Sequence, residues 1–204
     1  MARTKTLLLA AALAAIAVPV AAQSFSEGYT FLKAVRERDG NTAERILSNP
    51  SSTAINHRDA STGENALHIL VRGRDSGWLA YMLGRGARAD VGDREGNTPL
   101  IIAAQLGWLE GAEILLGRGR ANVNQSNNRG ETPLIFAVHR RDMPMVRMLL
   151  RNRADPNQTD HVAGNSAIDY ARQDNRATGI LRLLENPQAA TPTVSGLTPP
   201  TPRP

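Results

Sequence analysis

The sequence of 204 residues contains no cysteine. That absence excludes disulfide scaffolds, zinc–thiolate sites, thiol nucleophiles and the acylated cysteine of a bacterial lipoprotein. Aromatic residues make up only 4% of the chain, so the core must be built mainly from aliphatic side chains. This composition favours close-packed helices over an all-β fold, and the length suits one ordinary domain.

Lysine is almost absent, because Lys5 and Lys33 are the only two among 24 basic residues and the others are arginines. With 19 acidic residues the net charge is +5, and the sequence pI is about 10.4. Guanidinium groups suit the recognition of phosphates and carboxylates, but they are equally common on solvated helix faces. The charge alone therefore identifies no partner.

Long hydrophobic runs are also missing, apart from residues 7–18. This run is shorter than the roughly 20 residues that cross a bilayer core. Basic Arg3 and Lys5 precede it and the small residues 20–22 follow it, an order typical of an export signal. We expect residues 1–22 to be cleaved, leaving 22 basic and 19 acidic residues, a net charge of +3. An uncleaved N-terminal anchor and a buried helix are the alternatives.

Proline is concentrated at the other end of the chain, since residues 187–204 hold six of the 12 prolines. The rest of this segment is mostly Thr, Ser, Ala and Gly, which offers little apolar mass. Such a composition predicts an extended, solvated, disordered tail. A proline-rich ligand or a spacer is the alternative role for this tail.

Between these ends the sequence repeats itself. Four glycines, Gly63, Gly96, Gly130 and Gly164, follow one another at intervals of 33, 34 and 34 residues, and a similar phrase follows each of them. Pairs of small or apolar residues recur at the same interval, four positions apart as on one helix face. A period of this length indicates stacked supersecondary units.

The unit around Gly96 shows what each repeat should form. Gly96 suits a turn with positive φ, Thr98 can cap a helix, and Pro99 fits its first turn. Residues 100–105 then predict a short helix that closes near Gly107.

A second helix is expected over residues 108–116, with Gly117 or Gly119 as the left-handed residue that ends it. We expect Leu116 and Leu150, at equivalent positions of two units, to lie in the core between repeats. Because helix pairs this short cannot bury an apolar face alone, neighbouring units must stack into a solenoid.

The repeated phrase resembles the ankyrin repeat. It reads Gly-x-Thr-Pro-Leu, then Ala-Ala or Ala-Val, Leu-Leu, Gly-x-Ala and a turn that contains Asn. The resemblance covers residues 26–186 and is most specific at Thr98-Pro99-Leu100 and Thr132-Pro133-Leu134, in the units 93–127 and 127–160. It implies an all-α ankyrin-repeat solenoid of helix-turn-helix units.

Three further units depart from this pattern. One has Asn65-Ala66 in place of Thr-Pro but keeps the histidine of the motif as His68. Another has Ser166-Ala167 and a polar end, which suits a C-terminal cap. Residues 27–37 and 42–47 resemble a degenerate first pair of helices. We therefore predict about five units, including both caps.

Candidate catalytic or metal-binding residues are scarce. No nucleotide-binding glycine pattern, Gly-x-Ser-x-Gly elbow or His-Glu-x-x-His motif occurs in the sequence. We expect His68 to bond the turn backbone between repeats, and Trp78 and Trp108 to be buried there. The sequence thus predicts no enzyme, no cofactor and no metal site.

The remaining candidate site is a surface. The resemblance implies that turn tips and exposed residues of the first helices form a concave face that binds proteins. The matching positions are Arg72, Arg94, Glu95, Asn97, Gln105, Leu106, Arg129, Glu131, His139 and Arg140. We expect the centre of this face, around Arg129, His139 and Arg140, to be basic, although each of these residues could equally be a solvated position without a contact.

We therefore expect a monomeric, non-enzymatic module, periplasmic or secreted, that binds another protein through its concave face and has no stable membrane anchor after cleavage. An exported effector with a target in another cell is the alternative. Nucleic-acid binding is less favoured, because the charge after cleavage is small and the arginines are dispersed over every repeat.

Overall fold

The computed structural model describes residues 20–187 of the chain. Most of the predicted signal and all but the first residue of the predicted proline-rich tail lie outside these residues. Within residues 20–187 the secondary structure is helical, with ten α-helices, one short 3₁₀ helix and no β-strand. None of these helices is long and apolar enough to cross a membrane.

The ten helices form five consecutive pairs. They are α1 (Val20–Glu37) with α2 (Gly40–Leu47), α3 (Ala66–Arg72) with α4 (Ser76–Gly84), α5 (Pro99–Leu106) with α6 (Leu109–Gly117), α7 (Pro133–His139) with α8 (Met143–Arg151), and α9 (Ala167–Gln173) with α10 (Thr178–Glu185). The 3₁₀ helix η1 (Ala54–Asn56) follows the first pair. The prediction of about five units, with a divergent pair at each end, is confirmed.

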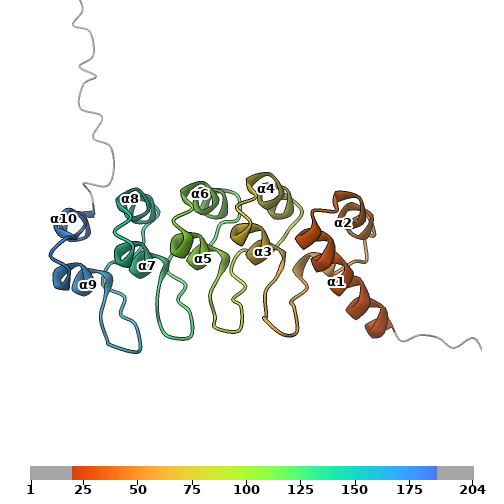
Figure 1. Ribbon diagram of the computed structural model, residues 1–204, viewed down its shortest axis with the longest axis horizontal. Helices are drawn as coiled ribbons and strands as arrows, with labels where there is room; N and C mark the ends of the chain where they lie inside the picture. Colours follow the sequence, from red (N-terminus) through yellow and green to blue (C-terminus); the bar gives the residue numbers. More distant parts are fainter. Residues whose placement is uncertain (1–19, 188–204) are drawn as a thin grey trace, which may run out of the picture.

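The pairs stack side by side in a single row (Figure 1). The first helices of the units lie in one layer and the second helices in another, and long turns extend from the side of the first helices (Figure 1). Each first helix packs on the next one, as α3 does on α5 and α5 on α7. The fold is therefore a solenoid in which every unit contacts mainly its neighbours.

Local sequence explains where the first helices begin and end. Thr98 and Thr132 have extended backbone, and each hydroxyl accepts a 3.3 Å hydrogen bond from the third amide of its helix. Pro99 and Pro133 occupy the first helical position, where the missing N–H costs nothing. Gly107, with φ of 64°, ends α5 in the left-handed conformation, as predicted.

The predicted end of α6 was wrong. Gly117 is its last helical residue, and the positive φ, 48°, belongs to Arg120. Gly119 is needed for a different reason, since a Cβ there would lie only 2.6 Å from the carbonyl oxygen of Leu115. The beginning of α6 also differs by one residue from the prediction, because Trp108 is the residue that precedes the helix.

Aliphatic side chains fill the core between the two layers. Leu100, Leu115 and Leu134 are fully buried, and Leu150 is buried as predicted. The expectation for Leu116 was wrong, because this side chain is only partly buried at the edge of the core. The residue that faces the core at this level of α6 is Leu115, one position earlier.

The two tryptophans differ in burial. Trp108 is buried, as expected, whereas Trp78 is only half-buried and packs against the core from its edge. The aromatic content of the core is thus as small as the composition predicted.

Candidate protein-binding surface

Four turns lie between successive units, one directly before the first helix of each following unit. They comprise residues 59–64, 93–97, 127–131 and 160–165, and a backbone hydrogen bond of 2.8 to 3.0 Å closes each of them from its first residue to its last. The first side chain of each turn, Asp or Asn, accepts hydrogen bonds from backbone amides inside the turn. Hydrogen bonds between its own residues therefore stabilise the conformation of each turn.

Successive turns are also bonded to one another. Backbone amides of Arg94, Asn128 and His161 donate to carbonyl oxygens of the preceding turn at 3.0, 3.0 and 2.7 Å. The acceptors are Thr62, Glu95 and Arg129, in the same order. We call the resulting continuous surface of residues 59–64, 93–97, 127–131 and 160–165 the turn ridge; it is the row of loops that extends from the helices in Figure 1.

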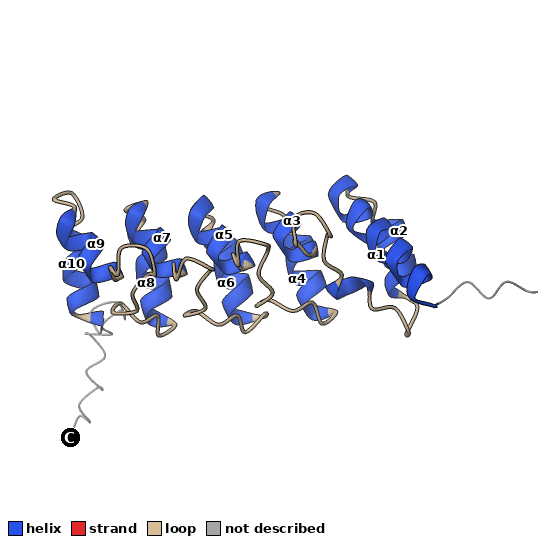
Figure 2. Cartoon of the chain, turned by 90° about the horizontal axis from the view of Figure 1, so that it is seen from below, coloured by secondary structure: helices blue, strands red, loops and turns tan. Residues whose placement is uncertain are grey.

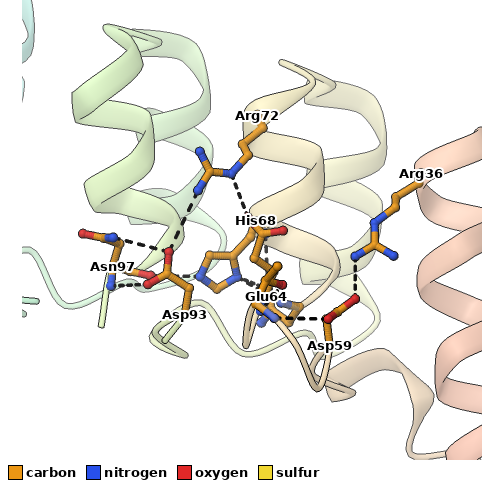
Figure 3. Close-up of polar contacts among 9 residues, drawn as sticks. Arg36, Asp59, Glu64, His68, Arg72, Asp93 and Asn97 are labelled. Carbon is orange, nitrogen blue, oxygen red and sulfur yellow. Dashed lines mark hydrogen bonds and ion pairs between the residues drawn. The ribbon is translucent and has the colours of Figure 1, made fainter. Parts of the chain in front are cut away.

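His68 ties the helices to this ridge. It is fully buried in α3, and its Nε2 lies 2.9 Å from the carbonyl oxygen of Asn97 in the next turn (Figure 3). Because a carbonyl oxygen can only accept, Nε2 must carry the proton. On the other side of the ring, Nδ1 accepts from the amide of Asn65 at 3.2 Å. The predicted role of His68, a bond to turn backbone between repeats, is confirmed.

Ion pairs surround this contact. The guanidinium of Arg72 donates to Glu64 at 2.7 Å and lies 3.9 Å from the nearly buried carboxylate of Asp93 (Figure 3). In the preceding turn, Arg36 of α1 donates to Asp59 at 2.8 Å. Hydrogen bonds from Ser61 and this contact with Arg36 hold the pKa of Asp59 well below its usual range. Asp59, Glu64 and Asp93 of the ridge are thus paired with arginines of the chain.

A depression of about 390 Å³ lies between the second and third turns. Its lining consists of Arg94, Glu95, Asn97, Gln105, Asn127, Asn128 and Arg129. Five of these seven were predicted as contact residues, and the structure brings them together in one place. Asn127 and Asn128 were missed, although their spacing of 34 residues from Asp93 and Arg94 could have found them.

The polar groups in this depression differ in how far they are already satisfied. Arg94 donates to the carbonyl oxygen of Ala60, and Arg129 donates to Glu131 at 2.7 and 2.9 Å. In contrast, the side chains of Glu95 and Gln105 form no hydrogen bond or ion pair with any described residue. These two groups can therefore bind a ligand without losing a bond inside the chain.

The other predicted residues lie outside the depression. The ring of His139 contacts that of Tyr170, with centroids 4.3 Å apart. Arg140 donates to the carbonyl oxygen of Gln105 at 3.0 Å, and the carbonyl oxygen of half-buried Leu106 accepts from Arg74 at 2.8 Å.

The arginines of the expected basic centre, Arg129 and Arg140, thus already have hydrogen-bond partners within the chain. Glu131 pairs with Arg129, while Arg140 is bonded to the backbone and not to an acid. The centre of the surface is a mixed polar region, in which a free carboxylate and a free amide lie beside paired arginines.

Among residues 20–187, no group of three potential metal-ligating side chains converges anywhere.

Comparisons with known proteins agree with this geometry. Family models of ankyrin repeats match residues 31–127 and 114–171. Neurogenic locus notch homolog protein 1 of Danio rerio is 32% identical over 132 residues, which are 65% of this chain and 5% of that protein. Its counterpart in Mus musculus is 30% identical over 133 residues, again 65% and 5%.

A bacterial relative is similar over a shorter stretch. An ankyrin repeat-containing protein of Treponema pallidum (strain Nichols) is 34% identical over 117 residues, which are 57% of this chain and 39% of that protein. The chain therefore matches only a small part of the notch proteins and less than half of the bacterial one. What these comparisons share with the chain is the repeat region.

Proposed function

Because the chain belongs to the ankyrin repeat family, whose repeats are protein–protein interaction modules, we propose that it binds a partner protein through the turn ridge and the adjoining ends of the first helices. The family is generally a non-enzymatic binding scaffold, and we extend that property to this chain. The export signal predicted at residues 1–22 leads us to propose that it acts in the periplasm or after secretion.

The observation that carries this proposal is the depression between the second and third turns. Its walls belong to turns that are closed by their own hydrogen bonds and bonded to their neighbours. Such a surface is ordered before a partner arrives, so binding costs little conformational entropy. The free carboxylate of Glu95 and the free amide of Gln105 offer acceptors and a donor to the polar groups of a partner.

Nothing around the depression favours catalysis instead. Its lining contains arginines, amides and one glutamate, but no histidine, serine or lysine that could act as a nucleophile or as a base beside one. The arginines of the lining are already bonded to Ala60 and Glu131. This composition suits recognition of a polar protein surface.

Affinity capture with the exported chain tests the proposal. The immobilised chain is incubated with an envelope extract, and the protein that it retains in stoichiometric amount is identified. The affinity of that partner is then measured by calorimetry. We expect Glu95→Ala with Gln105→Ala to weaken binding by about tenfold or more, since residues at the centre of an interface dominate its energy. Circular dichroism should be unchanged, because neither side chain has a partner in the described structure.

A matched double variant serves as the control. Arg118→Gln with Arg151→Gln changes two exposed side chains at the ends of the second helices, away from the ridge. We expect this variant to bind the partner like the unchanged chain. If the Glu95 and Gln105 variant binds normally while the control loses affinity, the partner-binding surface lies on the second helices and the proposal is wrong.

A further inference from the structure

The arginines of this chain fall into two groups with different surroundings. Those of the first helices, the turn ridge and the turns between paired helices are mostly bonded to carboxylates or to carbonyl oxygens, as Arg36, Arg72 and Arg141 are to Asp59, Glu64 and Asp174. In the described part of the chain, the arginines whose side chains have no such partner are Arg45, Arg88, Arg118, Arg120, Arg147, Arg151, Arg153, Arg176 and Arg182. All but Arg176 lie in a second helix or within four residues after its end.

Five of these arginines lie at the C-terminal ends of three successive second helices or within four residues after them. We call them the arginine strip: Arg88, Arg118, Arg120, Arg151 and Arg153. They follow α4 and α6 or lie at the end of α8, and the turns at these ends lie along one edge of the solenoid (Figure 2). Packed helices are about 8 to 10 Å apart, so the strip repeats its positive charges at that interval.

The strip is not neutralised by the chain itself. None of its five arginines lies within 4.0 Å of a carboxylate of the described residues. Asp90 and Asp155, two residues after Arg88 and Arg153, accept hydrogen bonds from the amides of Asn122 and Asn157. Glu113, five residues before Arg118, forms no ion pair with a described arginine. Arg85, beside the strip, differs because Tyr81, Glu44 and the carbonyl oxygen of Leu47 hold its guanidinium.

The side chains between these arginines limit what the strip can bind. Ala87, Ala121 and Ala154 lie next to it in sequence and are buried, so the strip offers no apolar patch for the core of a protein interface. No aromatic residue alternates with the arginines to stack nucleic-acid bases. What the strip offers is a row of exposed guanidinium groups, each of which can donate two hydrogen bonds to a phosphate.

We propose that the arginine strip binds the surface of a membrane rich in anionic phospholipids. Headgroup phosphates form a planar array of negative charge that can meet all five arginines at once, and no apolar insertion is required. This proposal does not rest on the proposed protein-binding function, because the strip shares no residue with the turn ridge. It describes a reversible, salt-dependent contact that leaves the turn ridge free to bind a partner.

Sedimentation with vesicles tests the proposal. The exported chain is mixed with vesicles of equal parts phosphatidylglycerol and phosphatidylcholine, and with vesicles of phosphatidylcholine alone. We expect binding to the anionic vesicles only, with loss of binding at high salt. Arg88→Gln with Arg118→Gln and Arg151→Gln should reduce the bound fraction at low lipid, with an affinity lower by about 100-fold, since each arginine near an anionic surface contributes about fivefold.

The matched control removes the same charge elsewhere. Arg36→Gln with Arg72→Gln and Arg129→Gln changes three arginines that are paired with acids, and we expect it to alter vesicle affinity by less than about fivefold. Both triple variants have the same N-terminus as the unchanged exported chain, so any contribution from that end cancels. Circular dichroism verifies that each variant is folded.

Four outcomes would overturn the proposal. The first is no binding to anionic vesicles by the unchanged chain. The second is an equal loss of binding in both triple variants, which would mean that net charge and not the strip decides. The third is strip-dependent binding of duplex DNA, added as a separate probe, without binding to vesicles, which would identify a different polyanion. A lower melting temperature of the strip variant with unchanged vesicle binding would be a fourth such outcome, because it would mean that the strip only stabilises the ends of its helices.

Discussion

The Nε2 atom of His68 lies 2.9 Å from the main-chain carbonyl oxygen of Asn97, so a buried side chain of one unit is bonded to the turn of the next. The contact joins the helical layer to the turn ridge and couples two neighbouring units. In a solenoid such contacts between neighbours supply much of the stability, because a single unit cannot fold alone.

The first prediction concerns the pH dependence of this contact. Burial lowers the pKa of His68 below its ordinary 6.5, and the bond to Asn97 and the carboxylates of Asp93 and Glu64 oppose that shift only in part. The unfolded chain therefore binds the proton more readily than the folded chain. The contribution of neutral His68 to the free energy of unfolding is therefore fully present above about pH 6.5. This contribution is lost as the pH decreases toward and through the lowered pKa of the folded chain.

Urea denaturation at about pH 7.5 and about pH 5.5 measures this effect. We expect the unchanged chain to lose more stability between these two values than His68→Gln, which cannot titrate. Equal losses in both proteins would show that His68 does not contribute to the pH dependence.

The second prediction separates two adjacent leucines of α6. Leu115 is fully buried, so Leu115→Ala should lower the free energy of unfolding by about 2 to 5 kcal/mol. Leu116 is only partly buried, and Leu116→Ala should cost clearly less. Chemical denaturation of both variants gives the comparison, and a larger cost for Leu116 would contradict the helix orientation described above.

The third prediction reverses the usual effect of alanine in a helix. A Cβ at Gly111 of α6 would overlap the ring of buried Trp108, so Gly111→Ala should destabilise the protein. Gly117 in the same helix has no atom within 4 Å of such a Cβ, so Gly117→Ala should stabilise by up to about 1 kcal/mol. Thermal denaturation of the two variants should give shifts of opposite sign.

The fourth prediction concerns arginines with positive φ. Arg120 has φ of 48° and a side chain without a partner in the described residues, so Arg120→Gly should raise the free energy of unfolding by up to about 1 kcal/mol. Arg141 has φ of 55°, but its guanidinium donates to Asp174 of the next unit at 2.5 Å. Arg141→Gly should give no such gain, because the relief of backbone strain is offset by the loss of the hydrogen bond between units. Urea titration distinguishes the two variants.

The fifth prediction is processing of the N-terminus. Cleavage after Ala22 would remove the first three residues of α1 and leave Gln23 as the new first residue. N-terminal sequencing of the exported protein should begin at Gln23, and fractionation should recover it from the periplasm or the culture medium. Full-length protein retained in the membrane fraction would contradict this prediction.

Most of the helical architecture could be predicted from the sequence, because the signals that begin and end each unit are local. The hydroxyl of Thr98 caps a helix that starts one residue later, and Gly107 reverses the chain directly after that helix. These interactions involve residues a few positions apart, so they are visible in the order of amino acids. The period of the repeat then implied that such units stack.

Two of the errors arose where the sequence offers two neighbouring residues of the same kind. Gly117 and Gly119 both suit the end of α6, yet Arg120 takes the positive φ and Gly119 instead allows close approach to the carbonyl oxygen of Leu115. Leu115 and Leu116 are equally apolar, and only the packed orientation of α6 decides which of them is buried.

For the candidate site, the sequence by itself determined which residues the turns and first helices present, because the repeat assigns each position to a place in the unit. Only the tertiary structure decided which of their charges remain free. Ion pairs such as Arg36 with Asp59 and Arg141 with Asp174 join residues 23 and 33 positions apart, in different units. Since Coulomb interactions depend on distance in space and long arginine side chains can reach several partners, charge pairing appears only when the units are stacked.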